Sequence, residues 1–424
     1  MKTPICVVVN AYSTGKYLAK ELMARGFACV HVQSGPEIPE SYLKSFNASD
    51  FLCNITHHGD LKRTLTQLSD YDVAHVIVGS ELGVELADGL SESLNLLTNG
   101  TDLTRARRDK FEMMEALRAK GISTAEYLRA FDASEIIRWV AANGFEKIVM
   151  KPVNSAGSDN VHICQSKADI HSAFDRISNK INQLGLANRG VFVQEFLQGV
   201  EYIVNSVSRD KNHYIAEIWR CEKRQMRIGK GYTNIYDVEK LLPYHGEDQA
   251  KLIDYTLNVL NALEISHGPA HAEVMLTSRG PLLIEIGSRL MGGVEPSAFE
   301  ACLETHTIRL TADAYTDPSS FLRNCRRPYQ LKKFIYTVIL ISTVEGSVTR
   351  IPLIQQIERL ESFFSISMNV CEGTTIEKTV DLFSSPGLVY LVHSDRNILE
   401  RDYQMIRQLE PHGYVVQASE HVLA

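Results

Sequence analysis

Short apolar runs alternate with helical patterns through the first hundred residues. Apolar runs at residues 5–9, 28–32, 51–55 and 74–79 have the length and composition of buried strands. Residues 14–26 and 83–96 repeat apolar side chains at helical spacing, and Gly26 is the expected C-cap of the first of these helices. Alternation of this kind predicts a parallel sheet with flanking helices, so residues 1–100 are expected to form one α/β domain.

After residue 100 the pattern changes to longer stretches of strand. Residues 101–121 predict a turn and then a helix that begins near Asp102 or Thr104 and closes at Gly121. Strands are expected near residues 146–151, 161–164, 191–196, 201–207 and 213–219, which is an α+β pattern. A tail from about residue 330 opens with an apolar run at 334–342 and holds an amphipathic helix at 396–410. We therefore expect three parts, at residues 1–100, 101–325 and 326–424.

Composition excludes several classes of protein. The chain of 424 residues is 44% hydrophobic and 22% charged, which is ordinary for a globular protein. Its formal net charge of −7 gives no overall attraction to nucleic acid or to an anionic membrane, so neither is expected as a partner. The longest apolar run, at 334–341, is too short to span a bilayer, and the first apolar run is interpreted as a strand and not as a signal peptide.

The eight cysteines lie singly along the chain and form no CxxC pair. Zinc ribbons and thioredoxin-like redox chemistry therefore lack support. Scattered cysteines fit reduced thiols, and we expect the protein to be cytoplasmic.

Two strand-like runs within residues 268–287 predict a hairpin with an unusual pair of side chains. With a three-residue loop at 278–280, one face is wholly apolar and consists of these pairs: Leu276 with Leu282, Val274 with Ile284, and Ala272 with Ile286. The other face brings Glu273 opposite Glu285, at roughly 5 Å between side chains. Like charges at this spacing are destabilising, so the pair needs a physical reason.

Three interpretations of Glu273 and Glu285 compete. They could be a solvated surface pair, or a catalytic carboxylate dyad for acid–base work or glycoside cleavage. The favoured interpretation is a site for a hard divalent cation, because the cation removes the repulsion. Arg289 lies four residues after Glu285, on the same face if the strand continues. A cation and an arginine on one patch suit a polyphosphate whose charge moves during a reaction.

A tract of small and polar residues follows the apolar strand that ends at Lys151. Residues 154–160 read NSAGSDN and precede a second apolar run at 161–164. Small residues allow backbone N–H groups to approach phosphate oxygens, so we interpret the tract as a phosphate cover and Lys151 as a phosphate contact. The alternative is an ordinary hairpin loop.

The segment NAYSTGKY at residues 10–17 is a partial match to a phosphate-binding P-loop. Asn10 stands where that motif has its first glycine, and Tyr17 stands where it has a hydroxyl for magnesium. We interpret the segment as a strand-to-helix turn. A substrate-facing role stays open, since ligands sit at the carboxyl ends of parallel strands.

Four segments resemble the successive motifs of the ATP-grasp ligases, in that family's order. They are DKFEMMEALRAKGI, VMKPVNSAGSDNV, VQEFLQGVEY and HAEVMLTSRGPLLIEIGSR, and the resemblance covers about residues 1–320. It implies a small lid subdomain at about 125–195, a hinge at 194–197 that bonds adenine, and a metal-site subdomain at about 198–325.

The resemblance also implies roles for single residues. ATP would be bound by the two lysines on its phosphates, the loop, the hinge and a ribose-binding acid: Lys110, Lys151, Ser155, Ala156, Gly157, Ser158, Gln194, Glu195, Phe196, Leu197 and Glu201. Glu273 and Glu285 would hold Mg²⁺, with Mn²⁺ as an expected substitute. Arg289 would hold the transferred phosphoryl group, with the backbone at Gly292 and Gly293. One departure is Gly287, where the family usually has an asparagine as a further metal ligand.

Within that family the chain looks most like the L-amino acid ligases that make dipeptides. The segment at 78–100 and the tail motif at 375–395 carry this finer resemblance. It places the contact to a substrate amino group at Glu81, and His271 is a further candidate for substrate binding. Each of these residues could instead have a structural role. Glu81 could cap a helix. Lys110 could lie on a solvated helix face, and His245 and His271 could be structural histidines.

The expected activity is an ATP-dependent carboxylate–amine ligation. The resemblance implies an acyl phosphate intermediate, amino-acid or related carboxylate and amine substrates, and ADP and phosphate as products. A homodimer is one assembly that the sequence leaves open. The rival functions are another ATP-grasp reaction, such as purine-pathway ligation or biotin carboxylation, and a non-catalytic nucleotide-binding module.

Overall fold

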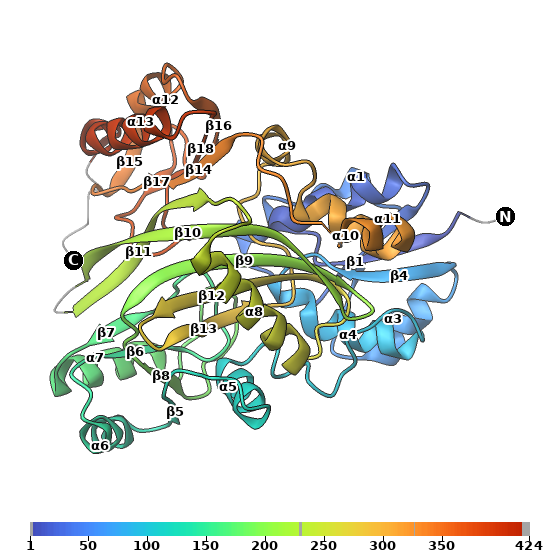
Figure 1. Cartoon of the computed structure of the whole chain (residues 1–424), viewed down its shortest axis with the longest axis horizontal. Coiled ribbons are helices and arrows are strands. Elements are labelled where there is room, and N and C mark those ends of the chain that lie inside the picture. The colour runs from blue at the N-terminus through green and yellow to red at the C-terminus, as the bar shows by residue number, and fades with distance from the viewer. Residues whose placement is uncertain (1–2, 229–230, 326, 418–424) are drawn as a thin grey trace.

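A computed structural model describes residues 3–228, 231–325 and 327–417. The chain begins with a four-stranded parallel sheet in the order β3-β2-β1-β4, as the sequence predicts (Figure 1). These strands are β1 (Ile5–Val9), β2 (Ala28–Gln33), β3 (Asn54–Thr56) and β4 (Val73–Val78). Helices and short 3-10 turns flank the sheet, namely η1 (Ser13–Tyr17), α1 (Leu18–Met23), α2 (Glu40–Leu43), η2 (Ala48–Asp50), α3 (Leu61–Leu68), η3 (Glu81–Gly83) and α4 (Val84–Ser93).

A second, twelve-stranded sheet forms the centre of the molecule. Its amino-terminal portion consists of short strands with two helices: β5 (Tyr127–Ala130), α6 (Ala133–Asn143), β6 (Ile148–Pro152), β7 (His162–Cys164), α7 (Lys167–Ile177) and β8 (Val191–Glu195). Long antiparallel strands follow, namely β9 (Gly199–Arg209), β10 (Asn212–Ile228), β11 (Gly231–Leu241), β12 (Gly268–Thr277) and β13 (Gly280–Gly287). Helices α5 (Lys110–Ala119), α8 (Glu247–Ala262), α9 (Pro296–Cys302), α10 (Thr307–Thr316) and α11 (Pro318–Asn324) pack around them.

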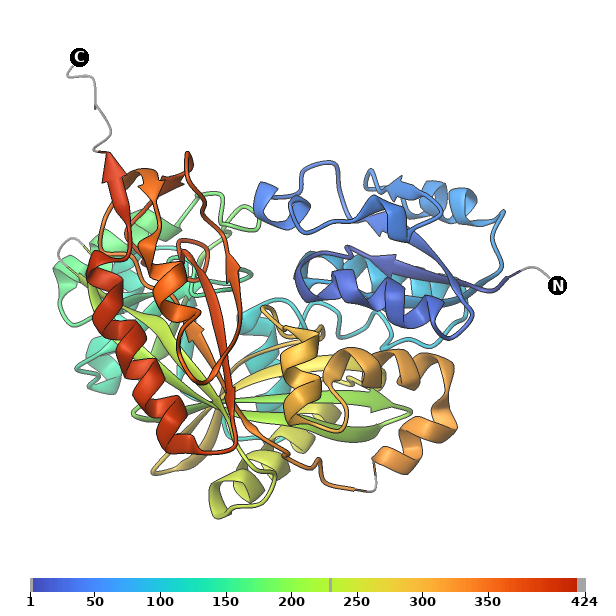
Figure 2. The ribbon, with the colours of Figure 1, turned by 90° about the horizontal axis from the view of Figure 1, so that it is seen from above.

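The carboxyl-terminal lobe extends the same sheet. Strand β14 (Phe334–Ile339) pairs with β11 on one side and with β18 (Gly387–His393) on the other, and β16 (Phe363–Met368) pairs with β18. The lobe is completed by β15 (Gly346–Arg350), α12 (Pro352–Ile357), β17 (Thr375–Ile376), α13 (Arg396–Leu409), η4 (Glu410–His412) and β19 (Val415–Gln417). Figures 1 and 2 show this lobe in red at one end of the long strands, and the amino-terminal domain in blue at the other.

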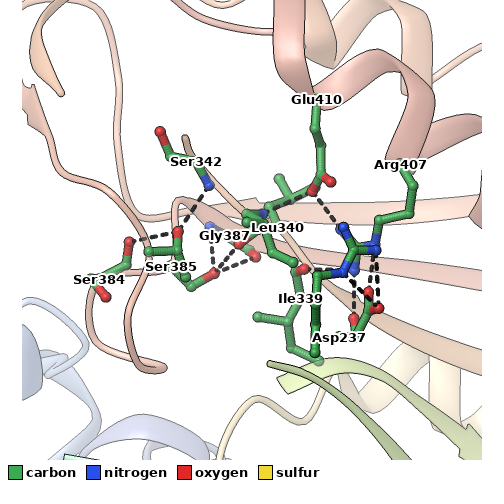
Figure 3. A network of polar contacts seen from close by, with 12 residues as sticks. Asp237, Ile339, Leu340, Ser342, Ser384, Ser385, Gly387, Arg407 and Glu410 are labelled. Atoms are coloured by element: carbon green, nitrogen blue, oxygen red, sulfur yellow. Dashed lines mark hydrogen bonds and ion pairs between the residues drawn. The ribbon is translucent and has the colours of Figure 1, made fainter. Parts of the chain in front are cut away.

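Buried ion pairs join the lobe to the central sheet. Arg407 of α13 pairs with Asp237 of β11 and with Glu410, and it donates to the carbonyl oxygen of Ile339 (Figure 3). Glu410 in turn accepts from the backbone N–H of Ile341 at 2.8 Å. The lobe is therefore anchored on β11 by side chains as well as by strand pairing.

Two predicted details are wrong. The helix expected to begin near Asp102 or Thr104 begins at Lys110, because the Asp109 carboxylate caps it by accepting from the N–H groups of Phe111 and Glu112. The hairpin loop is one residue shorter than expected, since Thr277 pairs with Gly280, which has φ +99°.

A bulge at Ile284 restores the register of the hairpin. Val274 therefore pairs with Leu283 and not with Ile284, and Leu276 pairs with Pro281. Ala272 still pairs with Ile286, and Glu273 with Glu285, as predicted. The shift puts Met275 and Ile284 on the face that carries the two acids. Across the described residues, no helix is long and apolar enough to cross a membrane.

Candidate active site

Two cavities meet at the centre of the molecule. The first, which we call the lid cavity, has a volume of about 130 Å³ and lies between the β6–β7 hairpin, the end of β8 and the β12–β13 hairpin. The second, which we call the domain cavity, has a volume of about 380 Å³ and is lined by the amino-terminal domain, the central sheet and the carboxyl-terminal lobe. Ala156 and Glu273 line both cavities. A group transferred from one cavity to the other would pass these two residues.

The predicted acid pair is present, and a lysine and a histidine side chain contact it. Glu285 Oε2 lies 2.9 Å from Lys110 Nζ, and Glu273 Oε1 lies 3.6 Å from His271 Nε2. Burial alone would raise the pKa of Glu273, but the hydrogen bond from His271 and the charge of Lys223 hold that pKa well below its usual range. Glu273 is therefore an anion, as a ligand of a hard cation must be.

Both predicted phosphate lysines point into the lid cavity. Lys110 Nζ donates to the carbonyl oxygen of Ser155 at 2.6 Å, which fixes the loop above it. Lys151 Nζ donates to the carbonyl oxygen of Ile284 at 3.4 Å, on the bulge of the hairpin. Burial lowers the pKa of Lys151 to about 8, although the charge of Glu285 opposes the shift. The run RARRDK is thus not a solvated helix face, since only Arg105 is exposed.

The loop at residues 154–160 is built around Asp159. Its carboxylate accepts from the Ser155 hydroxyl at 2.7 Å and from the backbone N–H of Gln183 at 3.0 Å. Gly157 has φ +68°, and a Cβ atom there would lie 2.8 Å from the Phe383 ring of the carboxyl-terminal lobe. The Leu382 N–H also donates to the backbone oxygen of Gly157 at 3.2 Å. This loop therefore rests on the lobe.

The predicted hinge and ribose-binding acid also line the lid cavity. Gln194, Glu195, Phe196, Leu197 and Glu201 are all among its lining residues. The Gln194 Nε2 group is buried without a hydrogen-bond partner. Glu201 pairs with Lys223 at 2.7 Å, a partner that sequence reasoning missed. Apolar walls come from Val149, Ile163, Met275 and Ile284.

Glu81 and Arg289 meet, although they belong to different parts of the chain. Arg289 Nε donates to Glu81 Oε2 at 2.7 Å, and Arg108 donates to the other carboxylate oxygen. Burial opposes ionisation, but the charges of Arg108 and Arg289 lower the pKa of Glu81 to about 2. A Cβ atom at Gly287 would lie 2.8 Å from Glu81 Oε2 and 3.1 Å from Arg289 Nε. The glycine that replaces the expected asparagine therefore makes room for this ion pair.

The remaining predicted residues lie along the domain cavity. His271 is buried there, and its Nδ1 lies 2.8 Å from the Asn205 side-chain oxygen, while Asn205 donates to the buried Glu217 at 2.7 Å. Burial lowers the pKa of His271, and Arg289 adds to the shift. Gly292 and Gly293 line the same cavity, whereas His245 lines neither cavity and packs edge-on against Tyr244.

Sequence reasoning missed several lining residues of the domain cavity. The amino-terminal turn supplies Ser13, Thr14, Lys16 and Tyr17, so the segment that resembles a P-loop faces this cavity. Other walls come from residues whose sequence contexts give no distinctive signal: Tyr42, Tyr236, Glu239, Thr337, Asn369, Phe383 and Ser385.

Comparison with known proteins assigns the family. The ATP-grasp domain profile matches residues 145–297. Dapdiamide A synthase of Enterobacter agglomerans is 34% identical over 418 residues, which cover 97% of this chain and 96% of that protein. The chain belongs to the ATP-grasp ligase family.

Two further similarities concern L-amino acid ligases. The L-arginine-specific L-amino acid ligase of Bacillus subtilis is 21% identical over 245 residues, 58% of this chain and 57% of that protein. The crystal structure of the L-amino acid ligase from Bacillus licheniformis superposes with a TM-score of 0.76 at 16% identity, covering 98% of this chain and 99% of that one. The predicted ATP-grasp fold is thereby confirmed, and the ligase is an ATP-dependent enzyme that joins a carboxylate to an amine.

Magnesium is typical of this family, and the acid pair fits it. Among residues 3–228, 231–325 and 327–417, no group of three or more histidine, cysteine, aspartate or glutamate side chains could hold a metal ion. The ligase thus offers two carboxylates, Glu273 and Glu285, at the wall of the lid cavity. Mg²⁺ is commonly held by one or two carboxylates, with substrate phosphates and water as the other ligands.

Proposed function

We propose that the ligase joins the carboxylate of one amino acid to the amine of a second and releases a dipeptide, ADP and phosphate. One observation carries this proposal. A cavity with lysines and paired acids shares Ala156 and Glu273 with a larger cavity that has many polar lining residues. The first suits a metal-bound polyphosphate, and the second has room for small carboxylate and amine substrates.

ATP is proposed to occupy the lid cavity. The apolar side chains of Val149, Ile163, Met275 and Ile284 suit the faces of adenine, and the unpartnered Gln194 amide suits its polar edge. Glu201 is the proposed contact of the ribose hydroxyls. Phosphates would lie between Lys110, Lys151 and the loop at 155–158, whose small side chains permit close backbone approach.

Mg²⁺ is proposed to bind Glu273 and Glu285, and Mn²⁺ to be accepted there. When bound, the metal neutralises charge on the β- and γ-phosphate oxygens. Lys110 already neutralises Glu285 in the structure, so it would move toward phosphate when the cation takes its place. The two acids and the two lysines together would position the polyphosphate next to the domain cavity.

The reaction is proposed to proceed in two steps. A carboxylate oxygen of the first amino acid attacks the γ-phosphorus of ATP, the bond to the bridging oxygen breaks, and ADP and an acyl phosphate result. The neutral amine of the second amino acid then attacks the acyl carbon. The carbon–oxygen bond to phosphate breaks, the nitrogen loses a proton, and inorganic phosphate leaves.

Residues of the domain cavity have proposed roles in these steps. Arg289 would stabilise the transferred phosphoryl group, and the backbone at Gly292 and Gly293 would stabilise the oxygen of the tetrahedral intermediate. Glu81 and His271 are the proposed substrate contacts. Because Glu81 forms an ion pair with Arg289, binding of a substrate amine at Glu81 would also change the position of the Arg289 side chain. The loop at 154–160 would exclude water from the acyl phosphate.

An amino-acid pair matrix tests the proposal. Phosphate release and product mass would be measured with ATP, Mg²⁺ and pairs of amino acids, and in parallel with bicarbonate and with purine-pathway amines. We expect phosphate release and a product of dipeptide mass with at least one amino-acid pair. Turnover only with bicarbonate or a purine-pathway amine would favour another ATP-grasp reaction and contradict dipeptide synthesis.

A further inference from the structure

Glu239 is a carboxylate of the domain cavity that the roles above leave unused. It lies on β11, where pairing with β10 shifts between Glu222 opposite Val238 and Lys223 opposite Tyr236. Asp237 is therefore a bulge, and the alternation of side chains resets there. As a result Tyr236 and Glu239, three residues apart, both line the cavity, while Asp237 pairs with Arg407.

The Glu239 carboxylate has no partner among the residues that the structure describes. Its residue is 7% exposed, no hydrogen bond reaches its side chain, and no cationic group lies within 4.0 Å. The nearby cation Lys223 is committed elsewhere, since its Nζ lies 2.7 Å from Glu201 and 4.1 Å from the centre of the Tyr236 ring. Because Glu239 lines the cavity and no side chain within the described residues pairs with it, its carboxylate is available to a group from outside the chain.

A second unpartnered polar group lies directly opposite. Thr337 of β14 faces Glu239 across the strand pair and lines the same cavity. It is 3% exposed, and its hydroxyl oxygen is buried without a hydrogen-bond partner. Directly opposed side chains in an antiparallel pair are near neighbours, so a carboxylate and a hydroxyl are presented to the same point in the cavity.

Glu81, another carboxylate of this cavity, is in the opposite condition. Glu81 has Arg108 and Arg289 on its two oxygens, so two positive charges already balance it. Burial and the charge of Glu273 raise the pKa of Glu239 to about 8, although the charge of Lys223 opposes the shift. Among the described residues, Glu81 has two cationic partners within 4.0 Å and Glu239 has none.

We propose that Glu239, with Thr337 beside it, binds a protonated primary amine of an amino-acid substrate in the domain cavity. An ammonium group brings the charge that Glu239 lacks and three N–H donors, two of which would reach the carboxylate and the threonine hydroxyl. A metal ion is a poorer occupant, because Glu239 and Thr337 offer one carboxylate and one hydroxyl, whereas Glu273 and Glu285 offer two carboxylates. The assignment rests on the proposed function, since it names the substrate class of that cavity.

The amine could be the α-ammonium group or one on a side chain, and binding measurements separate the two. Calorimetric titrations would be made with Mg²⁺ and a non-hydrolysable ATP analogue. The probes are L-alanine against L-lactate, which lacks the α-amine, and L-lysine against L-norleucine, which lacks the side-chain amine. Glu239→Gln removes the charge and keeps the shape, and Thr337→Val removes the hydroxyl.

We expect Glu239→Gln to lower the affinity for the probe that carries the recognised amine by roughly 10- to 100-fold. Thr337→Val should lower the same affinity by roughly 3- to 10-fold. Binding of its partner without that amine should be unchanged. Glu222→Gln is the matched control, since Glu222 lies on β10, pairs with Lys240 and lines neither cavity. Equal loss for both members of both pairs, no loss in Glu239→Gln, or no binding of either amine probe to the wild type would overturn the proposal, whereas equal loss for L-lysine and L-norleucine with a selective loss for L-alanine assigns the α-ammonium group. Amine binding that depends on Glu239 without dipeptide formation would instead contradict only the proposed function.

Discussion

At the scale of single residues, charges that look independent in the sequence form pairs across the molecule. Glu285 faces Glu273 on the hairpin and also contacts Lys110 from α5, so repulsion and attraction act on one carboxylate. Glu81 and Arg289 are 208 residues apart and share a hydrogen bond. Changing one such residue therefore alters the state of another, and each experiment needs a readout for both.

Glu285→Gln is expected to abolish most turnover without unfolding the protein. The substitution removes a proposed metal ligand, and ATP consumption should fall by roughly 100-fold or more, as for loss of a charge-stabilising group. It relieves repulsion from Glu273 but leaves the buried Lys110 without this partner, so these two effects oppose each other and the net loss of stability should be smaller than the roughly 3–5 kcal/mol of a buried pair broken from one side. Coupled ADP release and a thermal melt without nucleotide would measure both effects.

Glu126→Gln is a control for this substitution, because Glu126 is half exposed and pairs only with the surface residue Arg118. It should leave both quantities unchanged. Normal ATP turnover in Glu285→Gln would show that the acid pair does not hold the metal.

Gly287→Ala tests the close approach between the glycine and Glu81. The new Cβ atom would lie 2.8 Å from Glu81 Oε2, so the ion pair with Arg289 must shift. We expect the free energy of unfolding to fall by roughly 1–3 kcal/mol, which is typical of overpacked protein cores. In a Glu81→Ala background the same change should cost much less, which a double-mutant cycle by chemical denaturation would reveal. Additive losses would mean that Glu81 does not occupy the space above Gly287.

At the scale of elements, the sequence pattern of the strands predicts most of the fold, whereas the loop sequences predict little of it. The sequence predicts the parallel amino-terminal sheet and the pairing of Glu273 with Glu285, because one face of each strand must be apolar. It does not reveal the bulge at Ile284, since a shorter turn and a bulge together preserve the same parity. The late start of α5 was missed for a related reason, because the buried side chains of Arg107 and Arg108 make contacts that only the fold supplies.

The site shows the same division. The order of the motifs proposes Lys110, Lys151 and Glu201 as nucleotide contacts, and all three line the lid cavity. Glu239 and Thr337 were not predicted, because each is an ordinary strand residue until the carboxyl-terminal lobe is placed beside β11.

The loop at 154–160 provides a test of how an element closes a site. Gly157→Val would force a β-branched side chain into φ +68° and against the Phe383 ring. The loop should move off the lobe, and ATP affinity should fall by roughly tenfold or more with a small change in melting temperature. Phe383→Ala would relieve the steric contact but not the backbone strain, so it should rescue the variant only in part. Nucleotide titration of the three proteins decides this, and unchanged affinity in Gly157→Val would contradict the role of the loop.

At the scale of the whole molecule, the carboxyl-terminal lobe completes the domain cavity. It supplies Thr337, Asn369, Phe383 and Ser385 to the wall, and it holds β11 at Asp237, two residues from Glu239. The lobe is therefore part of the proposed amino-acid site and not an appendage. The arginine that fastens it, shown in Figure 3, should affect both stability and substrate binding.

Arg407→Met tests this coupling, since methionine keeps an unbranched side chain but removes the cation from Glu410 and one of the two arginines, Arg224 and Arg407, from Asp237. Breaking a buried ion pair from one side costs roughly 3–5 kcal/mol, so a large fall in the free energy of unfolding is expected. Because β11 loses one of its contacts to the lobe near Glu239, the KM of the amino acid should rise more than the KM of ATP. Arg401→Met on the same helix is the control, because Arg401 is 55% exposed and its ion pairs, with Glu361 and with the neighbouring Asp402, lie within the lobe and do not reach β11. Denaturant unfolding and steady-state kinetics on both variants separate the effects. An unfolding curve of Arg407→Met that matches that of Arg401→Met would show that the ion pairs do not hold the lobe. Equal rises in the KM values of the amino acid and of ATP would show that the lobe does not act through β11.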